Sequence, residues 1–400
     1  MVHDSIMSAA ELQALIENIS VDIDRQKEVL KELELRKIAA QRKFNAIRDP
    51  VGRMPLEISS EIFVLCLGRL PQPGSLHPPM LLLNICHVWS AIALSTPELW
   101  SRIHVDGNQG YKLPTLLDTW LKRAGSRALF LSFRGSFHMD TVAVIRRYTR
   151  QVQELATAFE GDELRSIIVE GELPALKTLR VMGAYDTSEA IDILRLLPHL
   201  VECSFDDLTA DFLIPEMLVH PQMQHFELGG NEKILSQIRL PGLKTLLLPM
   251  SYGDSSNQFL RDSLPPLRSV TFGWRPWTAN EMEECFSLLP KLTHLELSNT
   301  ARPGLNTATS LLVTILGNSP HLLPNLSSLA CQFGSFKPDN PWYSQLLNML
   351  LARRTKMKVV QMVMDLDRIA APPSDVCAAL RQLVADGMVI HIGADGQTLM

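Results

Sequence analysis

The 400-residue sequence has no apolar run as long as a membrane-spanning helix. Its apolar stretches are short, as at Leu246–Met250, whereas a spanning helix takes about 20 mostly apolar residues. The N-terminus has no basic segment followed by the apolar core of a secretory signal. We therefore expect no membrane partner and no secretion through such a signal.

The sequence also lacks a strong excess of one charge and any paired cysteines. The formal net charge is −5, so the basic character of a typical nucleic-acid binder is missing and we expect no nucleic-acid partner. The six cysteines are scattered without a Cys-x-x-Cys, which argues against a disulfide framework or a zinc ribbon. We expect reduced, buried thiols in a cytoplasmic or nuclear protein.

Common signatures of catalysis are missing as well. There is no Gly-x-x-x-x-Gly-Lys phosphate loop, no Gly-x-Ser-x-Gly elbow and no His-Glu-x-x-His. The adjacent Cys86 and His87 offer no useful ligand geometry, and no acid or cysteine is spaced to complete a metal site with His220 and His225. We expect no catalytic residue, no metal, no cofactor and no enzymatic activity.

Leucine, in contrast, is abundant at 64 residues, and it recurs in a repeat. The template Pro-x-Leu-x-x-Leu-x-Leu occurs seven times with apolar residues at all three leucine positions. The intervals are 24, 23, 20, 24, 25 and 34 residues, mostly within the roughly 20–29 residues of leucine-rich repeats. The units begin at Pro174, Pro198, Pro221, Pro241, Pro265, Pro290 and Pro324.

Each unit predicts a short strand followed by a helix. The last two apolar positions are two residues apart, so they point to one face of a strand, and the proline ends the preceding helix. Between the units, amphipathic segments such as 188–197 and 279–289 have helical spacing. The repetition predicts an α/β leucine-rich-repeat solenoid with a parallel sheet on its concave face.

Less regular segments extend this pattern, so we predict a solenoid over residues 101–400 with atypical terminal units. The additional strands are expected at 128–133, 164–169, 358–364 and 389–392, and the additional helices at 113–124 and 373–385.

Residues 8–48 differ, because no proline or glycine occurs between Leu12 and Ile47. A series of positions spaced alternately four and three apart is apolar at nine of eleven places, which predicts a long helix of coiled-coil type. Two interpretations stay open: self-association through 12–47, or packing on the helix's own chain. The series is Leu12, Ile16, Ile19, Ile23, Gln26, Leu30, Leu33, Lys37, Ala40, Phe44 and Ile47.

Residues 49–100 predict a small all-α module of two or three short, very apolar helices around a proline-rich link. Ile58, Ile62 and Leu65 share one face of the first helix, and the second is expected to run from Leu82 to Ile92. Such a module makes only a small core, so its apolar surface suggests a site that another protein covers.

Three motifs in this segment resemble an F-box. The family's opening Leu-Pro-x-Glu-Ile-x-x-x-Ile-Phe is matched by Met54-Pro55-Leu56-Glu57-Ile58 and Ile62-Phe63, with methionine in place of the first leucine. The later Cys-x-x-Trp with an apolar pair is matched by Cys86, Trp89, Ile92 and Ala93, and the closing Pro-x-Leu-Trp by residues 97–100. A heptad helix, this box and leucine-rich repeats together look like the large fungal class of F-box proteins.

The resemblance implies a substrate-recognition subunit of a cullin-type (SCF) E3 ubiquitin ligase. The box would dock onto a Skp-type adaptor and through it a cullin, and the repeats would bind an unknown target protein. The alternative is a leucine-rich-repeat scaffold or interaction protein without a ligase role. By the resemblance, the residues that face the adaptor or form the core of the box are Met54, Pro55, Ile58, Ile62, Phe63, Leu82, Trp89 and Ile92.

Target binding is expected on the concave face, from strand residues that alternate with the buried anchors. Their charges are mixed, which favours a protein target over a polyanion. The candidates are Thr178, Arg180, Glu202, Ser204, His225, Glu227, Thr245, Leu247, Ser269, Thr271, His294 and Glu296. A further hypothesis is that Trp274 or Trp277, foremost Trp277, is exposed and anchors the target, since tryptophan is enriched at hot spots. The alternative is that both rings cover the edge of the core.

Overall fold

The computed structural model describes residues 9–68, 71–106, 113–135, 137, 139–159, 161–171, 173–209, 217–250, 255–274, 277–298, 307–333, 338–364, 372–394 and 397–398. Its contacts divide the chain into two compact units. The first contains Met1–His104 and Asp118–Arg127, and the second Val105–Leu117 and Ala128–Met400.

The first unit begins with the expected long helix, α1 (Ala9–Arg48), which has no proline or glycine to interrupt it. Short helices follow, and the expected second helix of this segment is broken. Cys86 is extended, with φ −154° and ψ 173°, and it is the N-cap of the helix that follows it. The short elements are η1 (Val51–Arg53), α2 (Leu56–Leu65), α3 (Leu82–Ile85), α4 (His87–Leu94) and η2 (Pro97–Trp100).

Strands and helices alternate over most of the remaining chain. The strands are β1 (Arg102–Asp106), β2 (Leu129–Arg134), β3 (Val152–Thr157), β4 (Thr178–Asp186), β5 (Glu202–Thr209), β6 (Leu218–Val219), β7 (His225–Gly230), β8 (Ile238–Arg239), β9 (Thr245–Met250), β10 (Ser269–Trp274), β11 (His294–Ser298), β12 (Ser328–Phe333), β13 (Val359–Met364), β14 (Val389–Ala394) and β15 (Gln397–Thr398). The helices are α5 (Leu113–Ala124), α6 (Met139–Arg146), η4 (Thr149–Gln151), α7 (Gly161–Gly171), α8 (Thr187–Leu196), η5 (Glu232–Ser236), α9 (Ser255–Ser263), α10 (Ala279–Ser287), α11 (Thr307–Asn318), α12 (Asn340–Arg353) and α13 (Ser374–Ala385).

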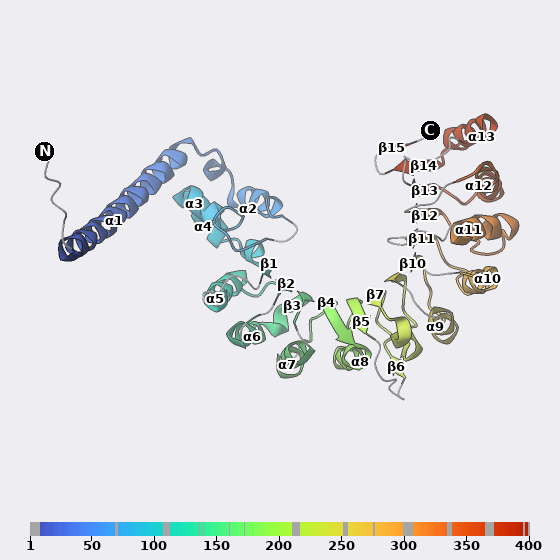
Figure 1. Cartoon of the computed structure of the whole chain (residues 1–400), viewed down its shortest axis with the longest axis horizontal. Helices are drawn as coiled ribbons and strands as arrows, with labels where there is room; N and C mark the ends of the chain where they lie inside the picture. The colour runs from blue at the N-terminus through green and yellow to red at the C-terminus, as the bar shows by residue number, and fades with distance from the viewer. Residues whose placement is uncertain are drawn as a thin grey trace. The chain divides into compact units, whose positions relative to one another are not determined.

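The strands form one sheet of 13 in the order β1-β2-β3-β4-β5-β7-β9-β10-β11-β12-β13-β14-β15. Each pair from β2 to β14 is parallel, and β15 is antiparallel to β14. In the second unit, helices α6 to α13 lie along the outer side of this sheet and the strands line its inner side (Figure 1). The two-residue strands β6 and β8 pair separately.

The repeat template marks the core of the second unit. All of its apolar positions are buried except Leu297, which is half-buried. At Pro198, the template proline is the second residue of a turn, and the leading leucine, Leu200, is the fourth. The Leu200 N–H closes this turn by donating a hydrogen bond to the Leu197 carbonyl at 3.2 Å. Equivalent turns surround Pro174, Pro241, Pro290 and Pro324.

A ladder of shared carbonyls joins successive strand starts. The Lys177 carbonyl accepts the N–H groups of Val201 and Glu202, and the Val201 carbonyl accepts those of Gln224 and His225. The Gln224, Lys244, Arg268, Thr293 and Ser327 carbonyls each accept two N–H groups from the next strand start in the same way. Each repeat therefore fixes where the next strand begins.

One expected strand is wrong. Residues 164–169 lie in helix α7, where Leu164, Ile167 and Ile168 are buried at helical spacing, and the strand of this region is β3 instead. The other expected strands and helices outside the seven units are confirmed, with bounds that differ by a residue or two.

Candidate functional site

Two rows of side chains cross the inner face of the sheet, at the positions that alternate with the buried anchors. Strand register places the members of each row directly beside one another. The first inner row is Glu154, Thr178, Glu202, His225, Thr245, Ser269, His294, Ser328, Val359 and Val389, and the second is Ala156, Arg180, Ser204, Glu227, Leu247, Thr271, Glu296, Ala330, Gln361 and His391.

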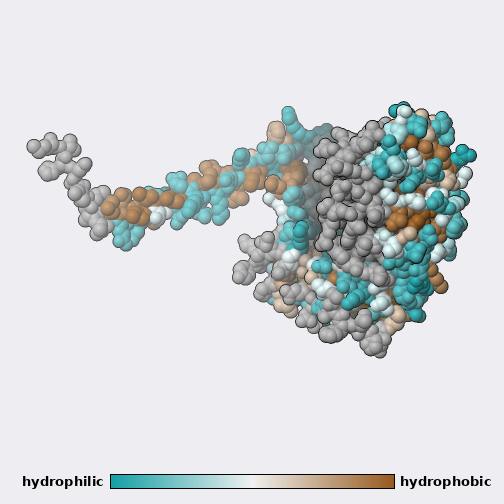
Figure 2. Space-filling view, turned by 45° about the vertical axis from the view of Figure 1, so that its right-hand side comes forward, coloured by the Kyte–Doolittle hydropathy of each residue, from teal (hydrophilic) through white to brown (hydrophobic). Residues whose placement is uncertain are grey.

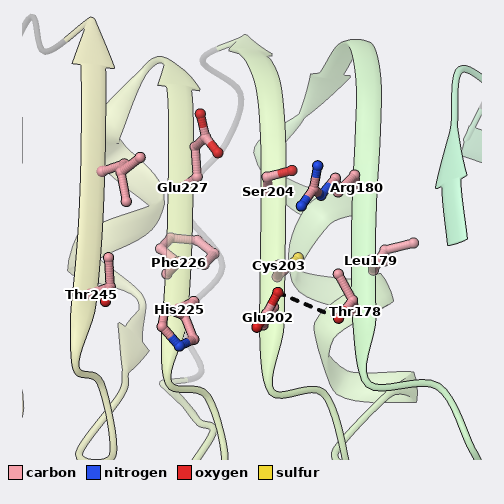
Figure 3. Close-up of a pocket in the computed structure, with 11 residues that line it drawn as sticks. Thr178, Leu179, Arg180, Glu202, Cys203, Ser204, His225, Phe226, Glu227 and Thr245 are labelled. Carbon is pink, nitrogen blue, oxygen red and sulfur yellow. Dashed lines mark hydrogen bonds between the residues drawn. The ribbon is translucent and has the colours of Figure 1, made fainter. Parts of the chain in front are cut away.

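A shallow hollow of about 160 Å³ lies on this face across β4, β5, β7 and β9. It brings together eight of the predicted target-binding residues, and the four with ionisable side chains are Arg180, Glu202, His225 and Glu227, as Figure 3 shows. The other lining residues are Thr178, Leu179, Cys203, Ser204, Phe226, Thr245 and Leu247. Thr271, His294 and Glu296 occupy the same rows but lie outside the hollow.

The hollow offers charges of both signs. Arg180 and Glu227 are exposed and stand on either side of the nearly buried Ser204, one strand away from it in each direction. Two strand spacings separate their backbones by about 10 Å, and no ion pair joins these two described side chains. The half-buried Glu202 accepts a weak hydrogen bond from the Thr178 hydroxyl at 3.5 Å. A ligand can therefore find both a free guanidinium and a free carboxylate here.

The buried thiols below this face have low reactivity. Cys203 is buried at the floor of the hollow, and burial raises the pKa of its thiol above the ordinary range. Cys331 on β12 is also buried, and burial together with the nearby Glu296 carboxylate raises its pKa. Both groups stay protonated at neutral pH, so neither supplies a nucleophile.

Farther along the rows, the polar side chains bind one another. Glu296 accepts hydrogen bonds from the Thr271 hydroxyl at 3.4 Å and from Gln332 Nε2 at 3.3 Å. His294 Nδ1 lies 2.8 Å from the Thr293 hydroxyl. These residues are therefore less available to a ligand than Arg180 and Glu227.

The expectation that Trp277 is exposed is wrong. Its ring is 6% exposed and packs edge-on against Phe272, with 5.3 Å between the ring centres. Thr278 directly after it caps helix α10 by accepting a hydrogen bond from Glu281 N–H. Trp277 therefore covers the core where the chain turns into α10. The side chain of Trp274 lies outside the described residues, as do Arg275 and Pro276.

In the first unit, the residues of the matched motifs fall into two groups. Phe63, Leu82 and Ile92 are buried in the core of residues 49–100, and the Trp89 ring packs against Phe63 at a tilt of 47°, with ring centres 4.9 Å apart. Leu99 and Trp100 of the closing motif are also fully buried. These residues hold the module together.

The second group is exposed on and beside α2. Met54 is 42% and Ile58 47% exposed, Pro55 is exposed, and Ile62 is half-buried. Leu56 and Leu65 on the same helix are 51% and 77% exposed, and the predicted adaptor-binding set did not include them. The module thus presents large apolar side chains over a core that Phe63 and Ile92 fill.

Sequence reasoning also missed Asp49, a buried acid at the end of α1. Asp49 Oδ1 accepts hydrogen bonds from Trp89 Nε1 at 2.8 Å and from Val51 N–H at 2.9 Å. The only local signal is its place directly before Pro50, at the point where the helix ends. Glu154, Gln361 and His391 extend the inner rows and were missed because their strands lack the full template.

Within the part of the chain that the structure describes, no group of three or more His, Cys, Asp or Glu side chains is placed to hold a metal ion. None of the helices described there has both the length and the apolar character needed to cross a membrane.

Comparisons with known proteins give distant likenesses only. No family model matches the chain, and no curated protein matches it. A crystal structure of a Bacteroides fragilis protein aligns at 15% identity and a TM-score of 0.37, covering 63% of this chain and 68% of that one. The crystal structure of the TLR13–ssRNA13 complex aligns at 14% identity and a TM-score of 0.37, covering 73% of this chain and 48% of that one. Scores at this level carry no argument about fold or function.

Proposed function

We propose that this chain is an F-box protein that serves as the substrate-recognition subunit of a cullin-type ubiquitin ligase. The observation that carries the proposal is the division of the motif residues in 49–100. Phe63, Leu82 and Ile92 form a core, while Met54 and Ile58 remain exposed. A small module that leaves such side chains in water gains stability when a partner covers them. The Skp-type adaptor is the partner that the motifs imply.

We assign the repeats the role of a leucine-rich-repeat solenoid that binds the target. The supporting features are the sequential parallel sheet, the buried template positions and the outer layer of helices. The hollow that Arg180, Glu202, His225 and Glu227 line is the favoured contact point on its inner face. Its charges of both signs fit a protein segment better than a polyanion.

In this role the chain performs no chemistry. The box fixes it to the ligase and the repeats hold the target, so that ubiquitin transfer occurs at a high local concentration of target. Binding and geometry are then the properties on which function depends.

The test is capture of a purified Skp-type adaptor by the full-length chain. We expect a complex that Ile58→Asp weakens at least tenfold, because the variant places a charge on the exposed apolar face of α2. The matched control is Val169→Asp, which makes the same change at a residue 55% exposed on α7 and leaves capture unchanged.

Trp89→Ala should also abolish capture, for a different reason. Its ring packs on Phe63 and its indole N–H binds Asp49, so the variant unfolds the module while the repeats stay folded. If the wild-type chain captures no adaptor, or if Ile58→Asp and Trp89→Ala both capture it normally, the ligase role is wrong. The scaffold or interaction role without a ligase then replaces it.

A further inference from the structure

Helix α1 exposes large apolar side chains between Leu12 and Ile47. The eight large apolar side chains of its four-three series are each between 46% and 75% exposed. Figure 2 shows hydrophobic residues (brown) beside hydrophilic ones (teal) along the helix. They are Leu12, Ile16, Ile19, Ile23, Leu30, Leu33, Phe44 and Ile47, and we call them the α1 seam.

Within the part of the chain that the structure describes, no residue covers this seam, because each of its side chains is at least 46% exposed. The hydrogen bonds of α1 to the short helices lie near its C-terminal end, where Arg42 donates to Asn84 at 3.0 Å and Asn45 donates to the Ile85 carbonyl at 2.9 Å. Arg42 and Asn45 are not members of the seam. Packing against the described residues of its own chain therefore does not bury the seam.

We propose that two copies of the chain associate through a parallel, in-register coiled coil of α1. The series assigns Ile16, Ile23 and Leu30 to heptad position a, and Leu12, Ile19 and Leu33 to position d. Two of these three a positions hold isoleucine and two of these three d positions hold leucine, and isoleucine at a with leucine at d favours two strands over higher orders. The seam covers about five heptads, more than the three or four that a sustained coiled-coil pattern takes.

The polar members of the series set the register. Gln26 occupies a d position and Lys37 an a position. In a parallel pair without stagger, each meets its own copy: the two Gln26 amides hydrogen-bond across the seam, and the two Lys37 side chains specify the register at a cost in stability. A shifted pair would place these polar groups against isoleucine or leucine, which is unfavourable.

The charges of α1 allow this pairing. The eight basic and seven acidic residues of this helix nearly cancel, so two copies do not repel strongly. Asp22 at position g lies opposite Lys27 at position e of the second copy, which is the attractive arrangement for a parallel pair. Leu15 and Val29, also at g, are 44% and 47% exposed and would extend the buried strip at its margin.

Self-association does not depend on the proposed ligase role. If both hold, one assembly presents two adaptor sites and two inner faces, and a target with two binding segments is held far more tightly than by one copy.

The first test is the mass of the full-length protein by light scattering at micromolar concentration. We expect twice the 44.8 kDa of one chain, and a fall to a single chain for the double variant Ile19→Asp/Ile23→Asp. The matched control is Val21→Asp, because Val21 lies between these residues on the opposite face of α1 and is 67% exposed. This control should keep the doubled mass.

A wild-type monomer, a trimer or tetramer, or a Val21→Asp variant as monomeric as the double variant would each overturn the proposal. Helix content measured by circular dichroism shows whether each variant keeps its fold.

The second test addresses orientation. In a Cys66→Ser background, which removes an exposed thiol, Gln26→Cys should form an interchain disulfide under mild oxidation. Val21→Cys, on the outer face, should not. A doubled mass without this cross-link would overturn the parallel, in-register arrangement.

Discussion

Trp89 and Asp49 are joined by a hydrogen bond of 2.8 Å from the indole Nε1–H to a carboxylate oxygen, across 40 residues of chain. Asp49 Oδ2 also accepts a weak contact from the Cys86 thiol at 3.8 Å. One buried acid at the end of α1 thereby ties α4 and the start of η1 together. Gly52 fits beside it because a Cβ there would meet Asp49 Oδ2 at 2.7 Å.

Replacing this acid should destabilise the first unit. In Asp49→Leu the Trp89 and Val51 N–H groups lose their acceptor, and each unsatisfied group costs about 1–3 kcal/mol. Asp49→Asn keeps an amide oxygen in the same place and should lose less. Urea unfolding followed by tryptophan fluorescence measures both, and equal stabilities of the two variants would contradict the role assigned to the carboxylate oxygen.

Arg353 performs a comparable task in the second unit. Its guanidinium donates to the carbonyls of Leu316, Ser319, Leu322 and Leu323 at 2.7–3.1 Å, and burial lowers its pKa from the ordinary value. Arg353→Met leaves these carbonyls without their donor, so we expect a loss of about 3 kcal/mol in the free energy of unfolding. Arg354→Met, at the exposed neighbour, should be close to neutral by the same thermal or urea measurement.

Gly229 marks a close approach of β7 to β5. A Cβ at this position would lie 1.8 Å from the Asp206 carbonyl oxygen. Only a shift of the backbone of β5 or β7 could relieve this clash, because the atom it meets is itself backbone. Gly229→Ala should therefore cost about 1–3 kcal/mol. Gly68→Ala is the control, since a Cβ there has no neighbour within 4 Å. A Gly229→Ala protein as stable as the Gly68→Ala protein would refute the close approach.

The buried thiols should resist labelling. Because burial raises the pKa of the Cys203 and Cys331 thiols, raising the pH from 7 to 9 does not produce their reactive thiolates in the folded protein. The expectation of buried thiols is wrong for Cys66, which is exposed, so an alkylating reagent should label it first and reach the two buried thiols only in denaturant. Mass spectrometry of labelled peptides gives the order, and early modification of Cys203 would contradict the burial.

The strands were predictable because the repeated template places an apolar residue at each position that the strand buries against the helices. Positions such as Leu179 and Val181 face the helices while Thr178 and Arg180 face away, and the register carries this alternation from strand to strand. Local pattern was therefore sufficient for the core and for the inner rows from β4 to β11, but not for Glu154, Gln361 and His391, whose strands lack the full template. The hollow itself needed the register, because only pairing brings Arg180 and Glu227 to the two sides of Ser204.

Other features depend on contacts that no local pattern contains. Residues 164–169 have the composition of a strand, but their buried side chains follow helical spacing. The sequence around Trp277 suggests an exposed ring, but its contact with Phe272 places the ring in the core. On α2, Ile58 and Phe63 are both apolar, and only the packing of Trp89 on Phe63 decides which one is inside.

In the ladder of shared carbonyls, each strand start accepts N–H groups from the next repeat along the chain, so the two neighbours of a strand start depend on it differently. When the strand start at Val201 opens, the N–H groups of Gln224 and His225 lose their common acceptor, whereas the Lys177 carbonyl upstream loses only its donors. An amide without an acceptor exchanges its hydrogen with water, and a carbonyl without a donor leaves no such trace. A local opening at one strand start should therefore raise deuterium uptake there and at the next strand start toward the C-terminus, and leave the preceding strand start protected.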